Sequence, residues 1–143
     1  MNTKKLQAIL AEHSLWLKGA GGCRADLREA ALECADLSKA NLSNANLKGA
    51  NLRGANLSFA DLRYANLRGA YLRYADLGGS DLGGSNLGYA NLRYADLSFT
   101  DLRYADLSNA NLSNADLTRA ILSGADLEGA DLKGTELENA NEN

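Results

Sequence analysis

The side chains most able to do chemistry in this 143-residue sequence are few and far apart. His13 is the only histidine, so a metal site built from several histidines is excluded by count. Cys23 and Cys34 are expected to be reduced thiols, and no activating neighbour for the outward-facing Cys34 can be identified. Aspartates are numerous, but they recur at a regular solvated position that offers no cleft to shift their pKa values. We therefore expect no enzyme, no cofactor and no metal.

Length and charge bound the remaining possibilities. The chain has no run of eighteen apolar residues, which indicates one domain without a membrane span. Gln7, Glu12 and His13 interrupt any apolar core of a signal peptide, so we expect a cytoplasmic protein. The formal net charge is -3, from 15 basic and 18 acidic side chains, so total charge predicts neither a nucleic-acid binder nor a strongly acidic mimic. Any electrostatic function must depend on how the charges are distributed.

A leucine recurs every five residues from Leu27 to Leu137, which makes twenty-three leucines in one register. The residue two positions before each leucine is small, and the residue just before it is Asp or Asn in nineteen repeats. Five steps of about 100° would scatter these leucines around a helix, and an odd period would put them on alternate faces of a strand. The pattern therefore requires a bend in every repeat, with Leu and the preceding Ala inside and three positions outside. Such a chain closes into coils that stack about 4.8 Å apart.

Units such as Ala40-Asn41-Leu42-Ser43-Asn44 and Ala60-Asp61-Leu62-Arg63-Tyr64 resemble the pentapeptide-repeat protein family. The resemblance covers about four fifths of the chain and is specific because the units keep one register. It implies an all-β solenoid, a right-handed quadrilateral β-helix with four pentapeptides per coil. Residues twenty apart should then lie above one another, and about six coils should form a rod about 28 Å long.

The ends of the chain differ from the repeats. Residues 1–22 are expected to form a capping helix and a glycine-rich link, residues 23–139 the β-helix, and residues 140–143 a polar tail. Thr3 is predicted to cap the helix, with Gly19, Gly21 and Gly22 at its end. Trp16 is expected to pack against the first coil, because a solenoid must cover its terminal leucines and backbone.

A glycine-rich stretch, residues 78–85, stays in repeat register. Stacking residues by twenty puts Gly79 between Phe59 and Phe99, and Gly84 between Tyr64 and Tyr104. Two interpretations follow. The strip could be a shallow notch for a flat or extended ligand, or the rings could lean over the glycines and cover exposed backbone. The second is favoured, because aromatic neighbours commonly shield glycines in sheets.

The same stacking sorts the charges onto different sides of the rod. One side aligns acidic residues, and the side before it in chain order aligns arginines with tyrosines. The members of the two rows are Asp36, Asp76, Asp96, Asp116 and Glu136 on the first, and Arg53, Arg73, Arg93, Tyr74 and Tyr94 on the second. Solubility and cross-coil pairing explain such rows more simply than specific recognition does.

Three functions compete. The favoured one is a non-catalytic scaffold that presents outward side chains to an unidentified protein partner, as a monomer or as an end-to-end homodimer through the C-terminal coil. The alternative, which the family resemblance implies, is a mimic of duplex DNA that regulates a type II topoisomerase such as DNA gyrase and protects against quinolones or toxins. Direct nucleic-acid binding through the arginine and tyrosine row is disfavoured by the net charge of -3.

Overall fold

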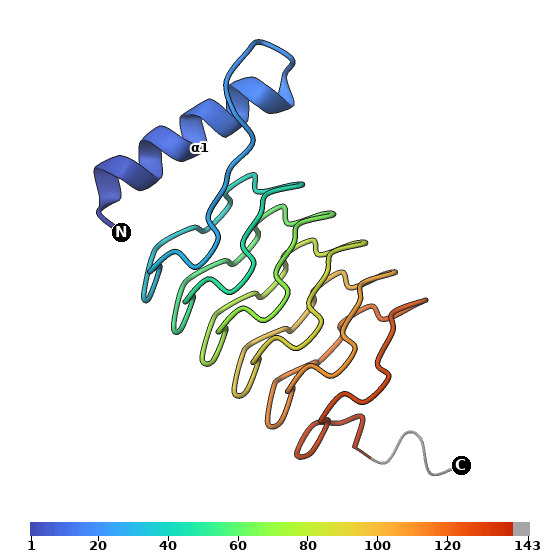
Figure 1. The fold of residues 1–143 in the computed structure, drawn as a ribbon. Coiled ribbons are helices and arrows are strands. Elements are labelled where there is room, and N and C mark those ends of the chain that lie inside the picture. The colour runs from blue at the N-terminus through green and yellow to red at the C-terminus, as the bar shows by residue number, and fades with distance from the viewer. Residues whose placement is uncertain (139–143) are drawn as a thin grey trace.

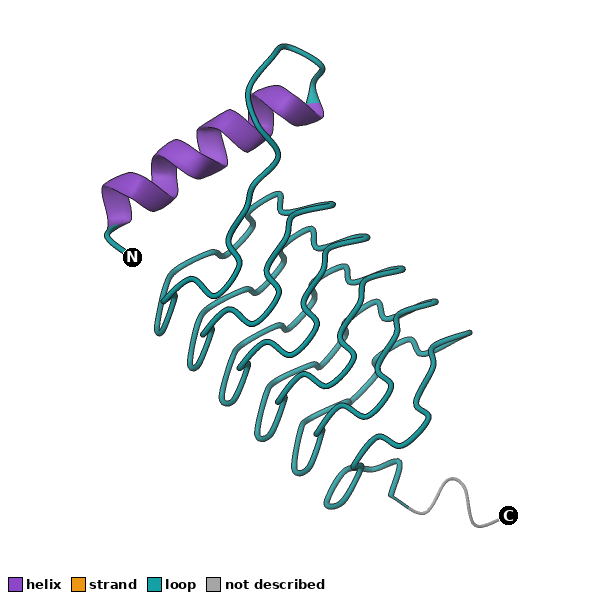
Figure 2. Ribbon diagram, viewed as in Figure 1, coloured by secondary structure: helices purple, strands orange, loops and turns teal. Residues whose placement is uncertain are grey.

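A computed structural model of the chain describes residues 1–138, so the predicted end of the β-helix at residue 139 and the predicted tail 140–143 lie outside the described residues. The described chain is a rod of stacked four-sided coils with one helix across its N-terminal end (Figure 1). Apart from that helix, the ribbon consists of turns and short extended pieces (Figure 2).

Neighbouring coils are joined in parallel register at a spacing of twenty residues. The residue before each leucine pairs with the residue twenty positions later, from Asp26 with Asn46 to Asn111 with Asp131. Four pentapeptides therefore make one coil, and the chain is a right-handed quadrilateral β-helix, as predicted. The extended pieces are isolated bridges and not longer strands, because each repeat bends before a second pair can form.

Each bend is a turn closed inside its own repeat. In one example the amide N–H of Ala50 donates to the carbonyl of Leu47 at 3.0 Å. Gly49, the residue before Ala50, has φ +66°, and every equivalent residue from Glu29 to Gly134 also has positive φ. The side-chain oxygen of Asn46 accepts the N–H of Lys48 at 3.3 Å. This contact recurs and explains the Asp or Asn before leucine, because both side chains supply the oxygen that the turn needs.

The core is the column of leucines with small residues between them. Leu42 to Leu112 are fully buried at five-residue intervals, and the alanines of the same register from Ala45 to Ala110 are equally enclosed. Four positions of the small-residue column carry hydroxyls, at Ser80, Ser85, Thr100 and Thr135. Thr100 donates to the carbonyl of Leu77 at 3.2 Å, whereas the buried hydroxyls of Ser80 and Ser85 have no hydrogen-bond partner.

The N-terminal helix α1 (Thr3–Leu17) covers the first coil. The prediction that Thr3 caps it was wrong, because Thr3 is already helical. Asn2 is the cap, with φ -80° and ψ 157°, and its side chain accepts the N–H of Lys5 at 2.8 Å. Leu6 faces the coil and is buried, while Trp16 stacks on the ring of His13 at 5.6 Å and remains 38% exposed. Trp16 therefore packs against His13 within the cap, whereas the sequence predicts packing against the first coil.

His13 fixes the helix to the β-helix. Its Nδ1 accepts the N–H of Ala25 at 3.1 Å, so Nε2 carries the proton and donates to the carbonyl of Ser43, also at 3.1 Å. Burial lowers the pKa of His13, an effect that the hydrogen bond to the Ser43 carbonyl opposes and the nearby charge of Arg24 reinforces. The neutral imidazole is thus a structural link between the cap and two successive coils.

Cys23 and Cys34 are exposed free thiols. Within residues 1–138, no helix has the length and apolar character needed to cross a membrane.

Candidate interaction surface

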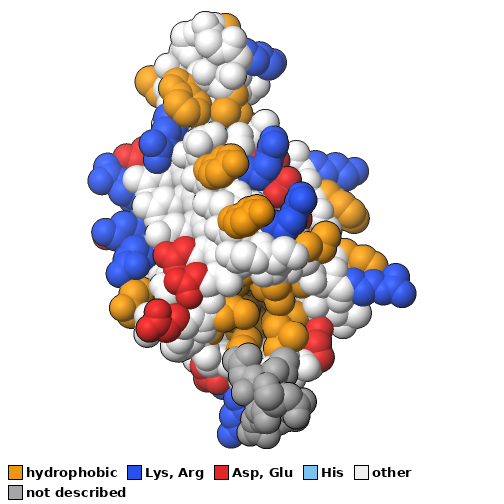
Figure 3. Space-filling view, turned by 90° about the vertical axis from the view of Figure 1, so that its right-hand side faces the viewer, with side chains coloured by type: hydrophobic (Ala, Val, Ile, Leu, Met, Phe, Trp, Pro, Cys, Tyr) orange, Lys and Arg blue, Asp and Glu red, His pale blue; other side chains and the backbone are white. Residues whose placement is uncertain are grey.

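Three sides of the rod carry the predicted site residues, and their charges differ. The acidic side is the row that contains Asp76, Asp96 and Asp116. The paired side follows it in chain order and contains Asp61, Asp81 and Asp101, with Arg63 and Arg103. The basic side precedes the acidic side and contains Asn51, Tyr71 and Asn91, with Arg53, Arg73 and Arg93. The face drawn in Figure 3 has basic side chains beside hydrophobic ones in the middle and a group of acidic ones towards one edge.

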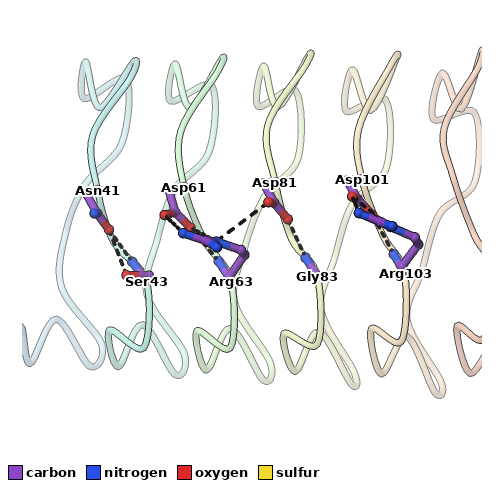
Figure 4. A network of polar contacts seen from close by, with 8 residues as sticks. All are labelled: Asn41, Ser43, Asp61, Arg63, Asp81, Gly83, Asp101 and Arg103. Carbon is purple, nitrogen blue, oxygen red and sulfur yellow. Dashed lines mark hydrogen bonds and ion pairs between the residues drawn. The ribbon is translucent and has the colours of Figure 1, made fainter. Parts of the chain in front are cut away.

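On the paired side, each arginine is neutralised inside its own repeat (Figure 4). Arg63 donates from Nε and Nη2 to the two carboxylate oxygens of Asp61, at 2.9 and 2.6 Å. Arg103 makes the same contacts with Asp101. These hydrogen bonds lower the pKa of both aspartates and raise that of both arginines. Asp81 has Gly83 where an arginine would stand, and Arg63 approaches it from the neighbouring coil at 3.6 Å.

On the acidic side, the carboxylates bond to the turns and not to cations. Asp76 accepts the N–H of Gly78 at 2.9 Å, and Asp96 accepts that of Ser98 at 2.8 Å. Hydrogen bonds from the side chain and backbone of Thr118 lower the pKa of Asp116. Among residues 1–138, no lysine or arginine forms an ion pair with this row, which leaves it as a line of about one charge per coil.

On the basic side, arginines and tyrosines form one stack. The rings of Tyr74 and Tyr94 lie 5.2 Å apart and 15° from parallel. Arg73 lies 4.8 Å from the Tyr74 ring centre and donates to the Tyr74 hydroxyl at 2.9 Å, and Arg93 lies 5.6 Å from the Tyr94 ring. The Nε atoms of Arg73 and Arg93 are buried and have no hydrogen-bond partner. An open hollow lies between Arg53 and Arg73, beside Tyr71.

The glycine strip combines features of both interpretations of the sequence. A Cβ at Gly79 would lie 2.7 Å from the Phe59 ring, and one at Gly84 would lie 2.6 Å from the Tyr64 ring, so these rings lean over the glycines. The rings are nevertheless 67% and 69% exposed. Open hollows remain between them and the rings of the coil beyond the glycines, Phe99 and Tyr104. Whether a ligand uses the strip stays a prediction.

The structure groups the predicted residues in separate places. The Phe59 and Tyr64 hollows are adjacent on the acidic and paired sides, whereas the arginine row lies on the basic side. Sequence reasoning missed Tyr71, and it missed the difference between paired and unpaired arginines. The sequence did contain a signal for this difference, because the residue two positions before an arginine of the paired side is Asp and before those of the basic side it is Asn or Tyr. Within the described chain, no three His, Cys, Asp or Glu side chains group as metal ligands do.

Comparison with known proteins agrees with the geometry. The family model for pentapeptide repeats matches in overlapping segments: residues 24–58, 50–88, 80–119, 90–129 and 110–141. The chain belongs to the pentapeptide-repeat family. A search of curated proteins finds no match.

Solved structures of pentapeptide-repeat proteins are similar to this chain. One from Nostoc PCC 7120 is 34% identical with a TM-score of 0.58, and the match covers 86% of this chain and 93% of that one. One from the thylakoid lumen of Arabidopsis thaliana is 31% identical with a TM-score of 0.53, over 68% of this chain and 64% of that one. This pentapeptide-repeat protein therefore spans somewhat less than two thirds of the Arabidopsis protein. QnrB1, a plasmid-mediated fluoroquinolone resistance protein, is 24% identical with a TM-score of 0.53 over 83% of this chain and 68% of its own, and shares the fold alone.

Proposed function

We propose that this pentapeptide-repeat protein is a rigid, non-catalytic scaffold that binds a protein partner through its outward side chains. The observation that carries the proposal is the exposure of aromatic rings on a backbone that is hydrogen-bonded from coil to coil. Tyr64 and Tyr104 are 69% and 76% exposed, although each stands on a coil bonded to its neighbours through several backbone hydrogen bonds. Exposed aromatic side chains on a rigid support are typical of binding surfaces, because little conformational entropy is lost on association.

The three differently charged sides support the same proposal. A scaffold can present a separate chemistry on each side of a rod, because residues twenty apart are fixed in line by the coil register. As part of the proposal we place the protein in the cytoplasm, where its two exposed cysteines would remain free thiols.

Mimicry of duplex DNA is the less favoured function. B-DNA carries one charge per about 1.7 Å of axis, whereas the acidic side offers about one per 4.8 Å coil. The row Arg53, Arg73 and Arg93 adds the opposite charge to the neighbouring side. The likeness to QnrB1 supports only the fold.

Affinity capture with variants of one side at a time tests the scaffold proposal. The acidic-side variant is D76N/D96N/D116N, the paired-side variant is R63Q/R103Q, and the basic-side variant is R73Q/R93Q. We expect one variant to lose a specific partner from a native lysate while the other two retain it, with unchanged circular dichroism for all three. Equal capture by all variants and by an unrelated rod would contradict the proposal. Inhibition of gyrase supercoiling that depends on the acidic side would favour the DNA mimic instead.

A further inference from the structure

The arginines of the rod fall into two classes that differ in one residue. The arginine follows the position before leucine by two residues, and on the paired side that position is Asp61 or Asp101. On the basic side the equivalent residues are Asn51, Tyr71 and Asn91, none of which is charged. On the basic side Arg53 pairs with Glu33 of the coil before it, whereas Arg73 and Arg93 form no ion pair within the described residues.

The contacts of the guanidinium groups confirm the difference. Nε of Arg63 and Nε of Arg103 donate to carboxylates at 2.9 Å, whereas Nε of Arg73 and Nε of Arg93 are buried without an acceptor. Burial of an unpaired donor on a charged group is costly, and an anionic partner that accepts from the remaining guanidinium nitrogens would offset part of that cost.

The side before the basic side carries both signs of charge, with Asp26 paired to Arg28 at one end and Asp106 and Asp126 farther along. There Lys48 and Arg68 follow Asn46 and Asn66, again without a carboxylate in the repeat. Apart from Asp26, the only carboxylate that pairs with a cation of these two sides in the described residues is Glu33, which meets Arg53 at 3.2 Å. Within the described residues, no ion pair joins the acidic side to these cations.

Tyr74 and Tyr94 favour carboxylates over nucleobases as the ligand, whereas Tyr71 on the same side is 57% exposed. Base recognition on an aromatic platform needs a free ring face. Tyr74 and Tyr94 are stacked on each other 5.2 Å apart, with the guanidinium groups of Arg73 and Arg93 against them. The stack instead holds those guanidinium groups in place, and it offers N–H and O–H donors to an acceptor.

The spacing of the three arginines indicates which secondary structure of a partner could match them. Arg53, Arg73 and Arg93 lie on successive coils, about 4.8 and 9.6 Å along the rod axis. Side chains at i, i+3 and i+7 of an α-helix lie about 4.5 and 10.5 Å along its axis, within about 1 Å of that row. Alternate side chains of a strand lie about 6.7 and 13.4 Å along it and lose register by the third residue.

From this juxtaposition we propose that the basic side binds an α-helix of a partner protein that carries Asp or Glu at i, i+3 and i+7. The helix lies along the rod, with one carboxylate at each of Arg73 and Arg93 and a third at Arg53, which already shares its charge with Glu33. The proposal rests on the scaffold function and names the chemistry of the partner.

The test uses two synthetic helical peptides of identical composition and net charge. One has Glu at i, i+3 and i+7 on one face, and its isomer has the same glutamates spread around the helix. Binding to the full chain is measured by fluorescence anisotropy at 50 and 200 mM salt. We expect the one-face peptide to bind more tightly than its isomer, and R73Q/R93Q to weaken it by at least about tenfold, since each lost charge-assisted hydrogen bond is worth about 1.5 kcal/mol or more.

Two further variants make the result specific. R63Q/R103Q removes the same residue types at the same repeat position from the paired side, and should change the affinity by less than about twofold, since a rim charge that makes no contact contributes little. N91D keeps the oxygen that accepts the N–H of Arg93 but supplies a carboxylate, as Asp101 does for Arg103, and should also weaken binding. Circular dichroism checks that each variant is folded.

Several results would overturn the proposal. Equal binding of the two isomers would remove the spacing argument, and equal loss in R63Q/R103Q would reduce the effect to net charge. Tighter binding of a single-stranded oligonucleotide, dependent on Arg73 and Arg93, would assign the surface to nucleic acid. If lysate capture depends on another side while neither peptide binds, the scaffold function stands and the helix proposal fails.

Discussion

The buried His13 ring makes the side-chain hydrogen bonds that join the cap helix to the coils, which makes His13→Ala an informative perturbation. In the native chain the ring is fully buried, accepts from Ala25 and donates to Ser43, each at 3.1 Å. Alanine would leave a buried N–H and a buried carbonyl without their partners. It would also remove the ring on which Trp16 stacks.

The expected cost follows from those lost contacts. A buried hydrogen-bonding group left without a partner costs about 1–3 kcal/mol, and an aromatic stacking contact adds about 0.5–1.5 kcal/mol. We expect His13→Ala to lower the free energy of opening the cap by about 2.5–7.5 kcal/mol. Hydrogen exchange should accelerate at the Ala25 amide, while the Leu92 amide, which bonds to Asn111 in the middle of the rod, should stay protected.

The same link should depend on pH. Burial lowers the pKa of His13 in the folded state, so the unfolded chain binds more protons. The contribution of the ring is therefore complete above about pH 6.5, the unfolded value, and is lost as the pH falls below it towards the lowered folded pKa. Protonation turns Nδ1 into a donor facing the Ala25 N–H. The fluorescence emission of Trp16, the only tryptophan, should change with pH through this transition. The pH-dependent change should be absent in His13→Ala. Unchanged Ala25 exchange in the variant, or pH-independent emission in the native chain, would refute the reasoning.

The remaining predictions concern the core and the glycine strip. Leu82→Ala should lower the free energy of unfolding by about 2–5 kcal/mol in urea, because Leu82 is fully buried, whereas Leu132→Ala in the partly exposed last coil should cost much less. Equal losses would contradict a core concentrated in the central coils. Gly79→Ala and Gly84→Ala should each lower the free energy of unfolding, measured by thermal denaturation, by about 1–2 kcal/mol. Both glycines have φ +65°, and a Cβ would press on the ring of Phe59 or Tyr64. Bulky residues at both glycines should also abolish partner binding if the strip is the binding site; undiminished binding would exclude it.

The repeat period predicted the rod and its core correctly, because an odd spacing of leucines admits no helix or straight strand. The number of sides came from the family resemblance, and the parallel pairing of Asp26 with Asn46 confirms it. The cap residue was wrong by one position, since Asn2 and Thr3 are both good caps and only the backbone angles decide between them.

The conformation of the aromatic residues could not be predicted from local rules. Seven of the eight Phe and Tyr residues have positive φ, a region that costs a side chain about 1–2 kcal/mol and that usually selects Gly or Asn. The compensation comes from contacts twenty residues away. Phe59 covers Gly79, and Tyr74 stacks on Tyr94. The position of the arginine row could be predicted, because the register of twenty residues places equivalent residues in line. Whether each arginine is paired with a carboxylate required the side-chain geometry.

The choice between Asp and Asn before leucine links the fold to the surface. The turn needs only a side-chain oxygen that accepts the backbone N–H two residues later. Asp61 accepts that of Arg63 at 3.1 Å, and Asn91 accepts that of Arg93 at 3.3 Å. The two residues are thus close to equivalent for folding, yet they differ by a full charge beneath the side chain that follows. Asp neutralises Arg63, whereas Asn leaves Arg93 without a carboxylate in its own repeat. Because the fold tolerates either residue, the charge pattern of each side can change without loss of the rod, and recognition can be adjusted one repeat at a time.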